Sequence, residues 1–204
     1  MIRNASRSRN MFATSSLVKM GMLGGLGMIL MLLDFPLPLF PIFLQVDLSD
    51  VPAVIGAFSM GPAAGVMIEL LKNLLKLIVG SSTGGVGELA NFLVGAGYVL
   101  ILGIVYEKWP HRNGVILGAV LATVGAAVFA GVLNYFIFIP AYAVVMGLPV
   151  DAFVSVASQV NAAVVDLRTL VVFAIVPFNL VKGVIIAVAA VLVHRILRPL
   201  WDKF

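Results

Sequence analysis

The sequence contains no cysteine, only two histidines and few charged residues. Without cysteine, the chain can form no disulfide, offers no thiol nucleophile and cannot build a cysteine-ligated metal site. The histidines, His111 and His194, fall at the ends of apolar segments, so we expect no histidine-based metal or catalytic site between those segments. Charged residues make up 11% of the chain, against about 25% in an ordinary soluble domain. This scarcity of charge indicates an integral membrane protein.

Hydrophobic residues, in contrast, make up 62% of the chain and gather in runs of about 20, long enough to cross a bilayer as α-helices. We therefore expect an all-α membrane protein with one transmembrane domain, residues 1–204. Six spans are predicted, at about 12–33, 50–61, 63–79, 88–106, 114–146 and 171–197. The second is short, and the fifth is long enough to need the bend that Pro140 can provide. The remaining segments are a tail at 1–11, a proline-rich loop at 34–49 and a connection at 147–166.

The basic residues are concentrated at one end of this predicted bundle and the acidic loop residues at the other. The first end carries Arg3, Arg7, Arg9, Lys19, Lys108, Arg112, Arg195, Arg198 and Lys203. The opposite loops carry Asp34, Asp47, Asp50, Asp151 and Asp166, with Arg168 as their only basic residue. Because cytoplasmic loops are enriched in lysine and arginine, both termini are predicted to be cytoplasmic. The formal charge of +4 therefore reflects membrane orientation and does not indicate a nucleic-acid partner.

Lys182 lies near the centre of the last apolar run, 171–193. A lysine at that depth costs about 2.5–3.5 kcal/mol on insertion scales, so some interaction must offset it. Asn179 precedes it by three residues and therefore projects from the same helix face. This pair predicts either a site for a polar, hydrogen-bonding ligand or an interhelical contact that only stabilises the bundle.

Other polar residues also fall within the predicted spans. Glu69, Lys72, Asn73 and Lys76 form one stripe, which we interpret as a self-neutralised seam rather than a pocket wall. Glu88 and Asn91 open the fourth span. The helix dipole alone can explain Glu88, whereas Asn91 lies one turn deeper and is a stronger candidate for ligand binding.

Asn134 and Tyr135 lie within the fifth span. A buried asparagine amide must satisfy both donors and an acceptor. Asn134 could pair with Asn179 across the bundle, or it could bind the edge of a heterocycle while Tyr135 or Phe136 stacks nearby.

Two glycine-rich segments suggest functions of their own. The loop at 80–87 resembles a phosphate cradle but lacks the Lys-Ser or Lys-Thr ending of a Walker A loop, so nucleotide hydrolysis by this chain is not expected. Gly21 and Gly25 form a small-xxx-small pair that lets another helix approach closely, either within the bundle or from a partner.

Several stretches resemble, in order, the substrate-binding S-components of energy-coupling factor (ECF) vitamin transporters, the riboflavin-specific members in particular. The specific ones are Gly-Gly-x-Gly-Glu-x-x-Asn-Phe at 84–92 and Pro-Phe-Asn-x-x-Lys-Gly at 177–183. The others are residues 47–52 with 61–62, 69–75 and 133–136. The resemblance covers nearly all the chain from Gly21 onward.

The resemblance implies a six-helix bundle that captures riboflavin, with FMN left open as a second ligand, and no cofactor of its own. It implies that Asn134, Asn179 and Lys182 hydrogen-bond the flavin ring, and that the loop at 34–49 acts as an outer lid through the segment from Leu44 to Asp47. The remaining members of the predicted substrate-binding set are Gln45, Glu88, Asn91 and Tyr135.

The same resemblance implies partners: a transmembrane coupling subunit and two ATP-binding subunits, in the cell membrane of a prokaryote. The family docks through an alanine-x-x-x-alanine motif on its first helix, and Gly21 and Gly25 occupy the matching positions here. Glycine keeps the close approach that such a contact needs.

Three alternatives remain from the residues alone. The chain could be an S-component for thiamine, biotin or pantothenate. It could be a membrane enzyme that modifies lipids, although the prolines around Asp34 and the lack of a second acidic cluster argue against a metal-binding catalytic site. It could also be a structural membrane subunit, in which case Asn134, Asn179 and Lys182 would tolerate apolar replacement.

Overall fold

The computed structural model describes residues 12–201, with side chains as far as 196. The predicted tail at 1–11, with Arg3, Arg7 and Arg9, lies outside the described residues, as does Lys203. The elements in chain order are α1 (Thr14–Met31), β1 (Phe35–Pro36), β2 (Gln45–Val46), α2 (Asp50–Met60), α3 (Pro62–Val79), α4 (Val86–Lys108), α5 (Arg112–Leu133), η1 (Asn134–Phe138), α6 (Ile139–Met146), α7 (Val150–Ser158), α8 (Leu167–Leu170), η2 (Val171–Ile175) and α9 (Val176–Trp201).

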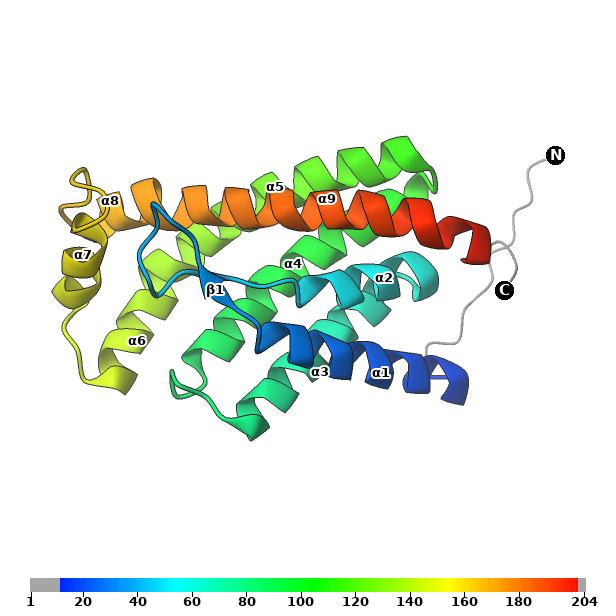
Figure 1. Cartoon of the computed structure of the whole chain (residues 1–204), viewed down its shortest axis with the longest axis horizontal. Helices are drawn as coiled ribbons and strands as arrows, with labels where there is room; N and C mark the ends of the chain where they lie inside the picture. The colour runs from blue at the N-terminus through cyan, green and yellow to red at the C-terminus, as the bar shows by residue number, and fades with distance from the viewer. Residues whose placement is uncertain (1–11, 202–204) are drawn as a thin grey trace.

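The helices form one bundle in which the chain runs back and forth between two ends (Figure 1). The start of α1, the α2–α3 junction, the α4–α5 turn and the end of α9 lie at one end. The loop that contains β1, the glycine-rich loop before α4, and α7 lie at the other. This path agrees with the predicted alternation of segments, and α7 occupies the predicted connection at 147–166.

Length and composition alone identify fewer membrane-crossing segments than the six that were predicted. Four segments of the described chain are long and apolar enough to cross a membrane: Thr14–Met31, Val86–Lys108, Arg112–Met146 and Leu167–Ile196. Helix α2 has only 11 residues, and α3 carries Glu69, Lys72 and Lys76.

The loop at 34–49 contains a short antiparallel ladder that the all-α prediction did not include. Phe35 pairs with Val46, and Pro36 pairs with Gln45. Proline can occupy a strand only where its missing N–H is not needed, which suits a two-residue strand at an edge. The ladder joins the two ends of the loop and directs its return toward α2.

The two long C-terminal helical segments each contain a π-helical turn just before a proline. Pro140 follows η1, and Pro177 follows η2. In each case the residue before the proline, Ile139 or Val176, donates its N–H to the carbonyl five residues back. Since proline has no N–H to donate, these turns provide wider backbone pairing where the regular ladder is interrupted. The predicted bend at Pro140 is therefore accompanied by a widened turn.

The interior contains two apolar clusters. One joins α2, α3, α4, α5 and α9 and includes Val54, Ile68, Leu102 and Ile186. The other lies toward the end that carries α7 and includes Ile139, Phe153 and Leu170. A cavity separates them.

Candidate ligand-binding site

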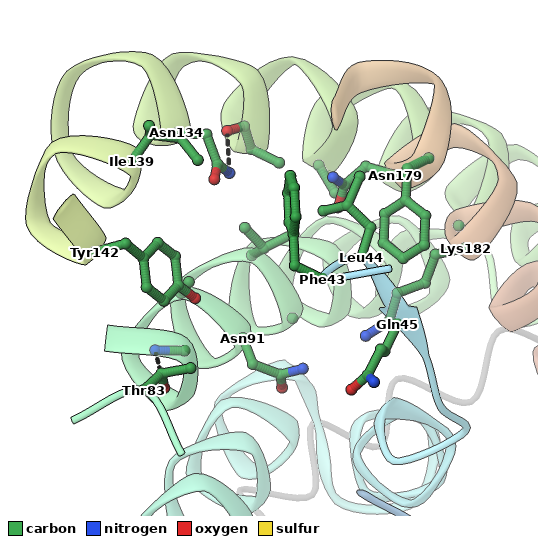
Figure 2. A pocket seen from close by; sticks show the side chains of 18 of the residues that line it. Phe43, Leu44, Gln45, Thr83, Asn91, Asn134, Ile139, Tyr142, Asn179 and Lys182 are labelled. Carbon is green, nitrogen blue, oxygen red and sulfur yellow. Dashed lines mark hydrogen bonds between the residues drawn. The ribbon is translucent and has the colours of Figure 1, made fainter. Parts of the chain in front are cut away.

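The cavity lies between the two apolar clusters and has a volume of about 260 Å³. That is many times the roughly 10–15 Å³ needed to hold one water, so the space suits an organic ligand. The loop at 34–49 supplies Phe43, Leu44 and Gln45 to its wall. Figure 2 shows these three side chains facing groups from α4, η1, α6 and α9 across the same space. Apolar walls with a few convergent polar groups are typical of small-molecule sites.

Lys182 lines the cavity, and two carboxylates offset its insertion cost. Its Nζ lies 3.1 Å from Asp47 Oδ2 and 3.7 Å from Asp50 Oδ2. Asp50 also pairs with Lys72, whose Nζ lies 2.8 Å from Glu69 Oε2. One buried ionic network therefore connects the loop at 34–49 with α2, α3 and α9. Asn179 shares the cavity wall with Lys182, as the three-residue spacing predicted.

Asp47 is held at the end of the loop by several groups. Its Oδ1 accepts the Ser49 N–H at 2.7 Å, and the residue is almost fully buried. Burial alone would raise the pKa of the Asp47 carboxyl, but the ammonium groups of Lys182 and Lys72 and the Ser49 hydrogen bonds together lower that pKa below its usual range. The carboxylate is therefore charged at neutral pH and holds the loop against α9.

The two pocket asparagines each donate to their own helix rather than to each other. Asn134 Nδ2 lies 2.8 Å from the Ala130 carbonyl, and Asn179 Nδ2 lies 2.9 Å from the Ile175 carbonyl. These bonds orient both amides and leave each carbonyl oxygen and one N–H for another partner. The predicted alternative, a pair between Asn134 and Asn179, is not what the structure shows.

Six of the nine predicted substrate-binding residues line the cavity: Leu44, Gln45, Asn91, Asn134, Asn179 and Lys182. Asp47 lies beside the cavity, bound to Lys182. Glu88 is directed to the loop before α4, where its Oε2 accepts the Ser81 hydroxyl at 2.7 Å and the Thr83 hydroxyl at 3.3 Å. Tyr135 stands apart from the wall, with its ring centroid 4.8 Å from that of Phe136.

The tyrosines that line the cavity are Tyr98, whose hydroxyl donates to the Gly183 carbonyl at 3.2 Å, and Tyr142, rather than Tyr135. In a regular α-helix, at about 100° per residue, Tyr142 would be rotated roughly 80° from Asn134. A π turn rotates by roughly 20° less per residue, so the five residues of η1 bring Tyr142 back to the face of Asn134. The proline at 140 was the available sequence signal for this widened turn.

Other wall residues were not predicted from the sequence. Asp50, named above only as an acidic loop residue, begins α2 without capping it, and its carboxylate pairs with the ammonium groups of Lys72 and Lys182. Thr83, Phe43 and Phe178 also line the cavity without having been predicted. Phe178 directly precedes Asn179 and contacts Phe40 of the loop edge-on, with the ring centroids 5.5 Å apart.

The polar stripe on α3 is largely internal, as predicted. Lys72 and Glu69 neutralise each other, and Asn73 Nδ2 donates to the Glu69 carbonyl at 2.9 Å. Lys76 instead donates to the Gly80 carbonyl at the end of the helix, at 2.9 Å. None of these four residues lines the cavity.

The glycines of α1 lie on two different faces of the helix. A Cβ at Gly24 would meet Leu71 at 2.7 Å, so this glycine permits close packing against α3. A Cβ at Gly21 or Gly25 would meet nothing within 4 Å. The Gly21–Gly25 pair therefore faces outward and does not serve packing within this chain.

A helical membrane bundle with a cavity of amides, hydroxyls and one neutralised lysine defines a substrate-binding membrane protein. The sequence model of the family described as the ECF transporter, substrate-specific component, matches residues 15–194. The chain belongs to this family, as the motifs at 84–92 and 177–183 predicted. The family contributes to transport, which leaves the lipid-modifying enzyme without support.

Individual relatives are similar over nearly their whole length. The riboflavin transporter RibU of Staphylococcus aureus (strain TCH60) is 33% identical over 192 residues, which cover 94% of this chain and 95% of the relative. The riboflavin transporter FmnP of Bacillus subtilis (strain 168) is 35% identical over 185 residues, which cover 90% and 92%. A solved structure of the S component of a bacterial ECF transporter has a TM-score of 0.73 at 30% identity, covering 90% of this chain and 95% of that one.

Proposed function

We propose that this chain is the high-affinity riboflavin-binding subunit of an ATP-driven ECF importer. The observation that carries the proposal is the convergence of Asn91, Asn134, Asn179 and Lys182 on one apolar cavity. Its support from outside the molecule is the similarity to two riboflavin transporters over nine tenths of the chain. Thiamine, biotin and pantothenate are the competing ligands.

The chemistry of the cavity suits a flavin. The pyrimidine edge of the isoalloxazine ring alternates carbonyl acceptors with an N–H donor. The free carbonyl oxygens of Asn134 and Asn179 can accept from that N–H, while their remaining N–H groups and the Lys182 ammonium can donate to its carbonyls. The dimethylbenzene edge suits apolar side chains such as Leu44 and Phe178.

The membrane arrangement that we propose has six crossings with both termini in the cytoplasm. The inner end then carries Lys19, Lys108, Arg112 and Arg195, in agreement with the positive-inside rule. Helices α2 and α3 cross within the bundle, where the ionic network neutralises most of their charge. The loop at 34–49 lies on the outer side and acts as the lid, through Leu44, Gln45 and the Asp47–Lys182 pair.

We further propose that the outward pair Gly21–Gly25 docks the transmembrane coupling subunit, which works with two ATP-binding subunits in a prokaryotic cell membrane. Small residues on an exposed helix face allow a second helix to approach closely in a bilayer. Helix α1 offers such a face without disturbing its own packing, since open space surrounds both positions.

The test is ligand binding by the purified full chain in detergent. We expect flavin absorbance to co-purify with the protein, or added riboflavin to raise its melting temperature, while thiamine, biotin and pantothenate do neither. Stabilisation by one of those vitamins and not by riboflavin would assign the pocket to that vitamin. No response to riboflavin in either measurement would reject the proposal.

A further inference from the structure

Besides Gln45, Asn91, Tyr98 and Asn134, the cavity wall carries polar side chains in two places, and neither place offers a free cation. One place holds Asn179, Lys182 and Asp50, and the other holds Thr83 and Tyr142. Of the residues described along the cavity wall, Lys182 is the sole cation, and Asp50 the sole anion. Lys182 is already bound to Asp47 and Asp50, so it has little charge left to offer an anionic ligand.

The second place lies at the start of α4, where a helix N-terminus would ordinarily favour an anion. Here the chain's own groups occupy that position. Ser81 Oγ accepts the Gly85 N–H at 2.9 Å, and Thr83 Oγ1 accepts the Gly87 N–H at 3.0 Å. Glu88, in the first turn, is only 7% exposed, and its carboxylate accepts hydrogen bonds from the hydroxyls of Ser81 and Thr83.

The Glu88 carboxylate is in contact with a hydroxyl group of the cavity wall. Thr83 lines the wall and donates to Glu88 Oε2 at 3.3 Å. The Tyr142 hydroxyl lies near the same point, since a Cβ at Gly87 would lie 2.7 Å from Thr83 Oγ1 and 3.3 Å from Tyr142 Oη. This place therefore presents neutral hydroxyls to a ligand, with a buried negative charge directly behind them.

We propose that Glu88 is a specificity-determining residue that admits the uncharged flavin and rejects its phosphate ester, FMN. This inference rests on the proposed function. With Asn134, Asn179 and Lys182 at the pyrimidine edge, we place the ribityl chain, which leaves the central ring at N10, beside the Thr83 and Tyr142 hydroxyls. Those hydroxyls suit a polyol chain.

A phosphate at the end of that chain would carry about 1.5–2 negative charges at neutral pH. It would lie near the Glu88 carboxylate, with no free cation among the described wall residues to compensate for it. Like charges at such separations in a partly desolvated site change affinity by roughly tenfold or more.

The experiment measures dissociation constants for riboflavin and FMN, by quenching of flavin fluorescence, in the wild type, Glu88→Gln and Glu107→Gln. Glu107 is the matched control, since it lies at the other end of α4 and is exposed to solvent. We expect wild type and Glu107→Gln to bind FMN at least roughly tenfold more weakly than riboflavin, and Glu88→Gln to narrow that ratio by roughly fivefold.

A second measurement needs no variant, so it can show whether charge or size excludes the phosphate even if Glu88→Gln fails to fold. The neutral dimethyl ester of FMN is larger than FMN but carries no charge. Binding of this ester within roughly threefold of riboflavin supports rejection by charge.

Rejection of the ester as strongly as FMN would show that size excludes the phosphate, and it would overturn the role of Glu88. An FMN-to-riboflavin ratio that is equal in wild type and Glu88→Gln, or a wild type that binds both flavins equally, would also overturn it. In those cases riboflavin binding, and with it the proposed function, still stands. A wild type that does not bind riboflavin would overturn both the role of Glu88 and the proposed function.

Discussion

At the scale of single residues, Lys182 has two sets of neighbours. On one side Asp47 and Asp50 neutralise its charge, and on the other the residue lines the cavity beside Asn179. A charge in a membrane helix is tolerated when it is paired or when it faces a polar cavity, and Lys182 meets both conditions. The ion pairs fix where its ammonium lies, and this position allows it to donate to a ligand carbonyl.

Lys182→Met tests the contribution of this ammonium. We expect riboflavin affinity to fall at least roughly tenfold, because a charge-assisted donor is worth about 1.5–3 kcal/mol and the variant also leaves two carboxylates less well paired. Titration of flavin fluorescence measures the affinity, and thermal unfolding shows that the variant folds. Lys76→Met is the control, since Lys76 binds the Gly80 carbonyl away from the cavity. Wild-type affinity in Lys182→Met would contradict a pocket role for this lysine.

At the scale of elements, the loop at 34–49 is held to the bundle by its ladder and by one buried ion pair. Because the pKa of Asp47 lies below its usual range, this carboxylate stabilises the folded state above its ordinary pKa of about 4, and that contribution is lost only in stronger acid. Phe43, Leu44 and Gln45 precede Asp47 and form part of the cavity wall. The ion pair should therefore determine how long this wall stays in place.

Asp47→Asn should weaken the hold of the loop while leaving Lys182 paired with Asp50. We expect riboflavin to dissociate roughly tenfold faster, with a smaller change in its association rate, because affinity differences within one site arise mostly from dissociation. Stopped-flow fluorescence separates the two rates. Asp34→Asn is the matched control, an exposed carboxylate at the other end of the same loop. An unchanged dissociation rate in Asp47→Asn would show that the ion pair does not retain the lid.

Helices α2 and α3 are joined by a buried charge whose removal should be costly. Lys72 is fully buried, pairs with Asp50 and Glu69, and donates to Ser49 Oγ at 2.8 Å. Lys72→Met leaves both carboxylates without this partner, so we expect it to destabilise the protein by about 3–5 kcal/mol. Thermal unfolding in detergent, without ligand, measures the loss. Adding Asp50→Asn to this variant should recover part of the stability, and equal stability of Lys72→Met and Lys76→Met would refute the argument.

The long helices and several polar residues of the wall could be predicted from the sequence, because apolar runs and three-residue spacings are local properties. The positions of Asn179 and Lys182 on one wall are an example. The pairing of Lys182 with Asp47 could not, since the two residues are 135 positions apart. Tyr142 was missed because one widened turn changes the helical phase after Asn134. Glu88 was included in the predicted substrate-binding set, but the Ser81 and Thr83 hydroxyls hold its carboxylate toward the loop before α4.

At the scale of the whole molecule, the cavity and the proposed docking surface lie on separate parts of the bundle. The cavity lies between α4, α5, α6, α9 and the loop at 34–49, whereas Gly21 and Gly25 face outward from α1. Helix α1 supplies no residue to the described cavity wall. The two functions should therefore respond separately to mutation.

The double variant Gly21→Leu/Gly25→Leu tests this separation. Because a Cβ at either position would meet nothing within 4 Å and leucine favours helix over glycine, we expect the isolated subunit to fold and to bind riboflavin as the wild type does. We expect co-purification with the coupling subunit and ATP-driven uptake into vesicles to be lost, because two leucines prevent close approach of a partner helix. Val120→Phe adds bulk to an exposed face of α5 and should preserve both activities. Wild-type uptake by the double variant would show that the coupling subunit docks elsewhere, and loss of riboflavin binding would show that α1 contributes to the pocket after all.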